Sequence, residues 1–216
     1  MHVGILGGTG PAGRGVAVRL AEAGIRVTIG SRDAERAAQI VGELSEKVPS
    51  LAPLLEGADN AGAAAAELVV VATPWDSVVP TVRALREPLA GKVVISMANA
   101  LLKEGKEMLA LVPPRGSVAA AVQAALPDSL VAAAFHHLPA SEMENLDSAL
   151  EADVLVCSDH PEATAATLGL IEQMKGLRPI DAGSLSQAAA IEAFTAVCIT
   201  VNIRHKVHTT LRLVGI

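Results

Sequence analysis

Three glycines near the start of the chain have the spacing of a phosphate-binding turn. Gly8, Gly10 and Gly13 fit the pattern G-x-G-x-x-G and directly follow the apolar run of residues 3–6. In such a turn the second glycine lets a pyrophosphate approach bare backbone, and the third lets a helix pack closely on the strand. The first N–H groups of that helix then face the phosphates. The alternative is a glycine-rich turn that binds nothing, but the position after a strand favours a dinucleotide site.

The end of the second apolar run indicates which dinucleotide binds. An NAD site usually has an acid there for the ribose 2′-hydroxyl, whereas an NADP site needs a cation for the 2′-phosphate. This run ends in Ser31 and Arg32, and Arg36 follows one helical turn later. Asp33 is better suited to begin the next helix. The arginines could instead belong to a solvated helix start, but a hydroxyl beside a guanidinium suits a phosphate dianion. We therefore predict NADP(H).

Two further apolar runs, residues 67–73 and 92–97, are typical of strands buried on both faces of a parallel sheet. In open α/β sheets, ligands bind beyond the carboxyl ends of the strands. The residues at these two ends, which we expect near a nicotinamide ring, are Thr73, Pro74, Trp75, Ala98 and Asn99. Trp75 has the alternative role of a core anchor.

The chain is poor in groups that could perform acid–base or nucleophilic chemistry. It has no tyrosine, no metal-binding motif, and only two cysteines, which we expect to be free thiols. A strand over residues 130–135 would bring His136 to the same sheet edge, where it could donate to a substrate oxygen, supply a proton or be purely structural. We predict no catalytic protein residue. If both redox partners are cofactors, the protein needs only to align them.

The remaining patterns predict an α/β fold. It is a Rossmann-type doubly wound parallel sheet with a smaller C-terminal α/β cap, divided into residues 1–125 and 126–216. Further predicted elements are helices at 33–46, 117–125 and 184–208, strands at 51–55 and 153–158, and a short strand and turn at 178–183. The net charge of −6 argues against a nucleic-acid partner. No signal peptide or membrane span is predicted, so a cytoplasmic location is expected.

The chain resembles the NADPH:coenzyme F420 oxidoreductases over essentially its full length. The motifs that carry this resemblance are Leu6-Gly7-Gly8-Thr9-Gly10, Ile29-Gly30-Ser31-Arg32, Thr73-Pro74-Trp75, His136-His137-Leu138-Pro139-Ala140 and the segment 177–185. The resemblance implies hydride transfer between NADP(H) and the 8-hydroxy-5-deazaflavin coenzyme F420. It also implies a homodimer, with the C-terminal domain binding the deazaflavin and forming the dimer contact.

The resemblance also assigns site residues. The residues that would hold the rest of NADP are Thr9, Gly10, Pro11, Ala12, Ser31, Arg32 and Arg36. Those that would border the nicotinamide are Thr73, Pro74, Val78, Ala98 and Ala140. The deazaflavin would lie beside His136 and Leu138. Its anionic tail requires cations, and Arg204 is our first choice, because it lies in the part of the last helix after Glu192, where no acid follows. Two alternatives stay open: an NADPH-dependent reductase of a small imine or keto acid, which needs a proton donor, and a non-catalytic NADP sensor.

Overall fold

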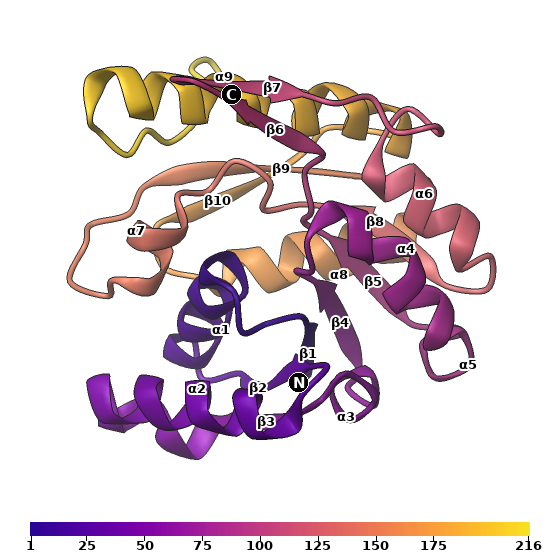
Figure 1. Ribbon diagram of the computed structural model, residues 1–216, viewed down its shortest axis with the longest axis vertical. Helices are drawn as coiled ribbons and strands as arrows, with labels where there is room; N and C mark the ends of the chain where they lie inside the picture. The colour runs from indigo at the N-terminus through magenta and orange to yellow at the C-terminus, as the bar shows by residue number, and fades with distance from the viewer.

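The central sheet has eight strands in the order β10-β9-β8-β5-β4-β1-β2-β3. The computed structural model describes all residues from 1 to 216 (Figure 1). Neighbouring strands are parallel throughout, except that β9 runs antiparallel to β8. The strands are β1 (His2–Leu6), β2 (Arg26–Ser31), β3 (Leu55–Asp59), β4 (Leu68–Val71), β5 (Val93–Ser96), β8 (Leu130–Ala133), β9 (Ala152–Ser158) and β10 (Leu177–Asp181).

The order from β3 to β8 confirms the predicted Rossmann-type fold. From that edge the strands follow one another as β3, β2, β1, β4, β5 and β8. This order, 3-2-1-4-5 plus one further strand, is that of a doubly wound dinucleotide-binding sheet. Strands β9 and β10 extend the same sheet past β8. Because β9 is antiparallel to β8, the carboxyl ends of β9 and β10 face the edge opposite to those of the first six strands. The division into residues 1–125 and 126–216 stays a prediction.

Helices cover both faces of the sheet. One face packs against α1, α2 and α8, and the other packs against α3, α4 and α6. Strand β4 shows why: all four of its residues are buried, with Leu68 and Val70 on one face and Val69 and Val71 on the other. The helices are α1 (Pro11–Glu22), α2 (Ala34–Lys47), α3 (Asn60–Ala64), α4 (Trp75–Ala84), α5 (Arg86–Leu89), α6 (Val118–Ala125), α7 (Ala140–Glu144), α8 (Pro161–Glu172) and α9 (Ala188–His205).

The segment before β3 differs from the prediction. The expected strand over residues 51–55 is wrong, because the chain forms a 3-10 helix, η1 (Pro49–Leu54), and the strand begins only at Leu55. Pro49 occupies the first helical turn, where its missing N–H is harmless, and Pro53 could not donate to a strand neighbour. The prolines therefore place the strand later than the hydrophobic pattern indicated.

A short hairpin between β5 and α6 was not predicted. Its strands, β6 (Leu101–Glu104) and β7 (Glu107–Ala110), pair antiparallel and lie beside α9 across the top of Figure 1. The N–H of Met108 donates to Thr200 Oγ1 of α9 at 2.9 Å. Helix α9 follows a 3-10 turn, η2 (Leu185–Gln187), and ends at His205, three residues before the predicted end, because Lys206 adopts a left-handed φ of 54°.

Helix α9 is more apolar than the sequence analysis anticipated. By length and composition alone, Leu185–His205 would be able to cross a membrane. Within the helix, however, the buried carboxylate of Glu192 accepts hydrogen bonds from the N–H groups of Val118 and Ala119 at 2.8 and 3.0 Å. Glu192 thus docks α9 on the first turn of α6, and the helix belongs to the folded body of the protein.

Candidate active site

The glycine-rich turn has the geometry that its sequence predicts. The N–H of Gly8 donates to the carbonyl of Gly30 at 2.9 Å, which joins the turn to the end of β2. A Cβ on Gly13 would lie 2.6 Å from the Cα of Gly8, so only glycine allows α1 to approach this closely. A Cβ on Gly10 would meet no atom within 4 Å. The backbone at Gly10 is therefore open to a ligand, in front of the first turn of α1.

A cleft of about 550 Å³ lies beside this turn, at the carboxyl ends of β1, β2, β4 and β5. Its lining includes most of the predicted cofactor-binding residues: Thr9, Gly10, Pro11, Ala12, Ser31, Arg32, Thr73, Pro74 and Ala98. The other lining residues are Gly7, Asn60, Ala72, Trp75, Ser77, Thr81, Met97, Asn99 and Leu101. Segments that are far apart in the sequence are thus brought together around one elongated site.

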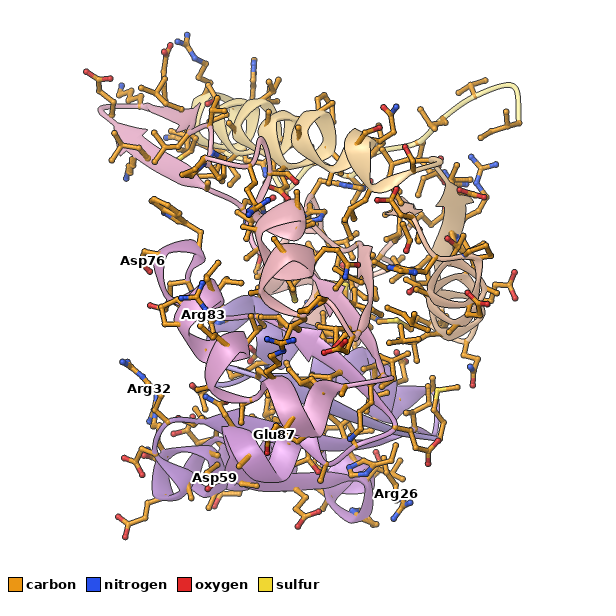
Figure 2. All side chains as sticks on the ribbon, turned by 90° about the vertical axis from the view of Figure 1, so that its right-hand side faces the viewer. Arg26, Arg32, Asp59, Asp76, Arg83 and Glu87 are labelled. Atoms are coloured by element: carbon orange, nitrogen blue, oxygen red, sulfur yellow. The ribbon has the colours of Figure 1, made fainter.

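The end of the cleft near β2 is suited to a phosphate. Ser31 is buried, and its Oγ accepts a hydrogen bond from the N–H of Asp33 at 3.2 Å. Asp33 caps α2 by accepting from the N–H of Glu35 at 3.0 Å, as the sequence predicted. Arg32 is exposed and forms no ion pair, and Figure 2 shows its side chain extending outward at the edge of the molecule. A guanidinium without a carboxylate partner is available to an anion.

Three of the predicted NADP contacts lie outside the lining of the cleft: Arg36, Val78 and Ala140, the last of which lines a neighbouring cavity. Arg36 is exposed on α2, where its Nη1 donates to Oε1 of Gln39 at 3.0 Å. Val78 belongs to α4 and is fully buried in the core on the inner side of that helix. Arg36 could therefore contact only a phosphate that extends beyond the cleft. Val78 cannot touch a ligand in the cleft and instead packs behind the residues that form its wall.

Trp75 lies at the start of α4 and lines the opposite end of the cleft. Its side chain is 39% exposed, so its alternative role as a core anchor is wrong. The lining also includes the apolar residues Pro74, Met97, Ala98 and Leu101, together with the uncharged polar residues Thr73, Ser77, Thr81 and Asn99, and none of these side chains is titratable. This end offers an apolar surface of the kind that flat rings require.

A second cavity, of about 50 Å³, lies next to the cleft. Four of the predicted site residues line it: Ala12, His136, Leu138 and Ala140. The pKa of His136 is lowered to about 3, chiefly by burial and also by repulsion from His137, while the backbone of Met97 opposes the shift. His136 is therefore neutral at physiological pH and is no reservoir of protons, although it can still donate one hydrogen bond.

Arg204 lies apart from both cavities. It is exposed near the end of α9 and forms an ion pair with Glu107 of the β6–β7 hairpin. A ligand tail would have to compete with this carboxylate. Exposed pairs of this kind are weak, so the competition is possible at low energetic cost.

Asn60 is a site residue that the sequence analysis missed. Its Oδ1 accepts a hydrogen bond from the N–H of Gly7 at 3.1 Å, and the residue lines the cleft at the start of α3. The two residues are 53 positions apart, so only the pairing of β3 with β2 brings them together. No group of three or more potential metal ligands occurs in the structure.

Comparisons with known proteins agree with this geometry. Residues 2–100 match the family described as "NADP oxidoreductase coenzyme F420-dependent". The F420-dependent NADP reductases of Methanocaldococcus jannaschii and Methanothermobacter marburgensis are each 36% identical to the chain. The alignments cover 95% and 96% of this chain, and 94% and 95% of those proteins. A solved structure from Arthrobacter sp. FB24, provisionally described as an F420-dependent NADP reductase, is 27% identical, with a TM-score of 0.83 over 99% of both chains.

Proposed function

The chain belongs to the family of F420-dependent NADP reductases, and on that premise we propose that it transfers a hydride between NADP(H) and coenzyme F420 in the cleft described above. One observation carries the assignment to this cleft. A glycine-rich turn and an unpaired arginine at one end adjoin an apolar surface without acid–base groups at the other. When bound, the two coenzymes supply the hydride chemistry themselves. The protein has to bind and align them.

We expect NADP to lie extended along the cleft. The open backbone at Gly10 and the first turn of α1 would hold the pyrophosphate, together with Thr9, Pro11 and Ala12. Ser31 and Arg32 would hold the 2′-phosphate, with Arg36 near its outer side. The nicotinamide would then lie at the carboxyl ends of β4 and β5, bordered by Thr73, Pro74, Ala98 and Ala140, with Val78 behind the wall.

The apolar end of the cleft is where the deazaflavin would stack against the nicotinamide. Trp75 and Leu101 provide flat and aliphatic surface there, while His136 and Leu138 border the adjoining small cavity. Such surfaces exclude water and hold two rings at contact distance, which is the main requirement of direct hydride transfer. Arg204 remains our candidate for the anionic tail, in competition with Glu107.

The outer face of α9 supports the proposal of a homodimer. Phe194 and Val197 are 40% and 54% exposed, and Leu102 of the adjacent hairpin is 52% exposed. Phe194 and Val197 are three residues apart on α9 and so share one face, and exposed apolar side chains on one face are typical of protein–protein contacts. We place the dimer contact there, in the C-terminal part that was expected to carry it. The cytoplasmic location stays a prediction.

The decisive experiment mixes the purified protein with NADPH and oxidised coenzyme F420 and follows the deazaflavin absorbance. We expect reduction of the deazaflavin with NADPH and little with NADH. Imines and keto acids serve as controls for the alternative reductase function. NADPH oxidation by those compounds but not by F420 would refute the proposal, and nucleotide binding without any oxidation would favour the sensor.

A further inference from the structure

Arg19 of α1 is a charged residue that is almost completely buried. It is 2% exposed, and its Nη1 forms an ion pair with Glu22 at 3.2 Å. Its other donors bind three backbone carbonyls of one distant segment: Nε donates to Met143 at 3.0 Å, and Nη2 donates to Glu142 and Asn145 at 2.9 and 2.8 Å. A lysine could not reproduce this set of contacts, because all its donors radiate from a single nitrogen.

The three carbonyls lie at the end of α7, which packs beside α1 (Figure 1). The last carbonyls of a helix have no partners within the helix, and the helix dipole also favours a cation at that end. Helix α7 has only five residues, which is too short for a helix that is stable by itself. Its place in the fold therefore depends on the groups that hold it, and the Arg19 guanidinium holds its end.

Gly15 provides a second, independent contact between α1 and α7. A Cβ at this position would lie 2.6 Å from the Cβ of Met143 and 3.1 Å from the carbonyl oxygen of Ala140. Met143 is 2% exposed and is enclosed by the core, so it has little room to move aside. The start of α7 thus lies directly on the backbone of α1, three residues after Ala12, which lines both the cleft and the small cavity.

Helix α1 therefore connects two parts of the candidate site. Its first turn faces the cleft at Pro11 and Ala12, where the pyrophosphate is expected. Its following turns hold α7, and the segment that leads into α7 brings His136 and Leu138 to the small cavity. Hydride transfer requires two rings at contact distance, and a displacement of about 1 Å caused far from the reacting atoms can lower a rate about 100-fold.

We propose that Arg19 is a positioning residue for hydride transfer. By holding α7 on α1, it fixes the segment from His136 to Leu138 relative to the pyrophosphate-binding turn, and so aligns the second coenzyme with the first. Arg19 itself lines neither the cleft nor the small cavity. The inference rests on the proposed function. Its consequence is that loss of Arg19 slows the transfer step in protein that is folded and still binds NADPH, whereas a residue that only stabilises the fold would leave that step unchanged.

The test follows the deazaflavin absorbance in single turnovers with saturating NADPH and F420, under conditions in which circular dichroism shows each variant to be folded. Arg19→Met should lower the rate constant of transfer about 10- to 100-fold, with the Kd for NADPH within about twofold of the wild type. Arg19→Lys should restore part of the rate, because its ammonium group can still donate to one or two of the carbonyls. Gly15→Ala should also slow transfer, because its methyl group displaces α7. Glu22→Gln is the matched control: it removes the ion pair but keeps the three carbonyl contacts, and should transfer at the wild-type rate.

NADPH that is deuterated at both C4 positions identifies the slowed step. Arg19→Met should show a primary isotope effect, and its absence would mean that a step other than transfer is slow, which overturns the inference. A wild-type rate in Arg19→Met, or an equal loss in rate and in NADPH affinity, would overturn it as well. If neither Arg19→Met nor Gly15→Ala folds, the contact serves folding and the inference is wrong. Failure of the proposed function is distinguishable from all of these results, because the wild type itself would then transfer no hydride to F420.

Discussion

Glu192 should make the stability of the protein depend on pH in an unusual direction. Burial raises the pKa of this carboxyl group from 4.5 to about 7, although the two backbone hydrogen bonds from α6 lower it. An acid whose folded-state pKa is raised holds an extra proton between the two pKa values. The free energy of unfolding therefore falls as the pH rises from about 4.5 to 7. A shift of 2.5 units (7 minus 4.5) corresponds to about 3 kcal/mol, because each unit contributes about 1.4 kcal/mol.

The measurement is urea unfolding, followed by far-ultraviolet circular dichroism, of the wild type and Glu192→Gln at pH 5 and pH 8. Other groups titrate in both proteins, so the difference between the two proteins isolates Glu192. Relative to the variant, the wild type should lose about 2.5 kcal/mol of unfolding free energy between the two pH values, slightly less than the full shift because pH 5 lies above 4.5. Glu172→Gln, on the exposed end of α8, is the matched control and should behave like the wild type.

The opposite sign would refute this reasoning. The two N–H donors of α6 favour the ionised carboxylate, as does the positive end of the helix. If the wild type gains stability relative to Glu192→Gln as the pH rises, these hydrogen bonds outweigh burial. A difference that does not change with pH would mean that the carboxyl group titrates alike in the folded and unfolded chains.

The remaining predictions concern the cleft and the C-terminal tail. Arg32→Ala should weaken NADPH binding by about 10- to 150-fold and leave NADH binding unchanged, because it removes a charged contact with the 2′-phosphate; equal losses would contradict this. Gly10→Val should fold normally but fail to bind either nucleotide in a calorimetric titration, since its side chain would fill the pyrophosphate site. Arg204→Ala should raise the KM for F420 modestly, more so at low salt, with the KM for NADPH constant. The Arg178 guanidinium lowers the pKa of Asp153 to about 2, so wild-type protein should lose stability relative to Asp153→Asn as the pH falls from about 4 to 2 in acid-unfolding curves.

The sequence predicted best those parts of the site that are formed by a few residues next to one another in the chain. The glycine turn, the Ser31-Arg32 pair and the ends of β4 and β5 are each defined by a few neighbouring residues, and all of them line one cleft. The buried strands could also be predicted, because a continuous apolar run such as Leu68–Val71 has to be covered by other elements on both faces of the sheet. The right-handedness of the crossovers then restricts the sheet orders that these strands can adopt.

Features that depend on distant contacts could not be predicted. Asn60 acts on Gly7 only because β3 pairs with β2, and its own neighbours give no sign of this role. The β6–β7 hairpin has short, charged strands without clear alternation, and its place is determined by packing against α9. The burial of His136 likewise depends on the surroundings that fold around it, so its neutral state was not apparent from its position after a strand.

The aromatic composition gives the cleft a built-in optical probe. The chain contains one tryptophan and no tyrosine, and that tryptophan, Trp75, lines the apolar end of the cleft with 39% of its side chain exposed. Nearly all intrinsic ultraviolet emission of the protein must therefore arise from this one position. Any ring that settles against it should change its intensity directly, without a label and without a background from elsewhere in the fold.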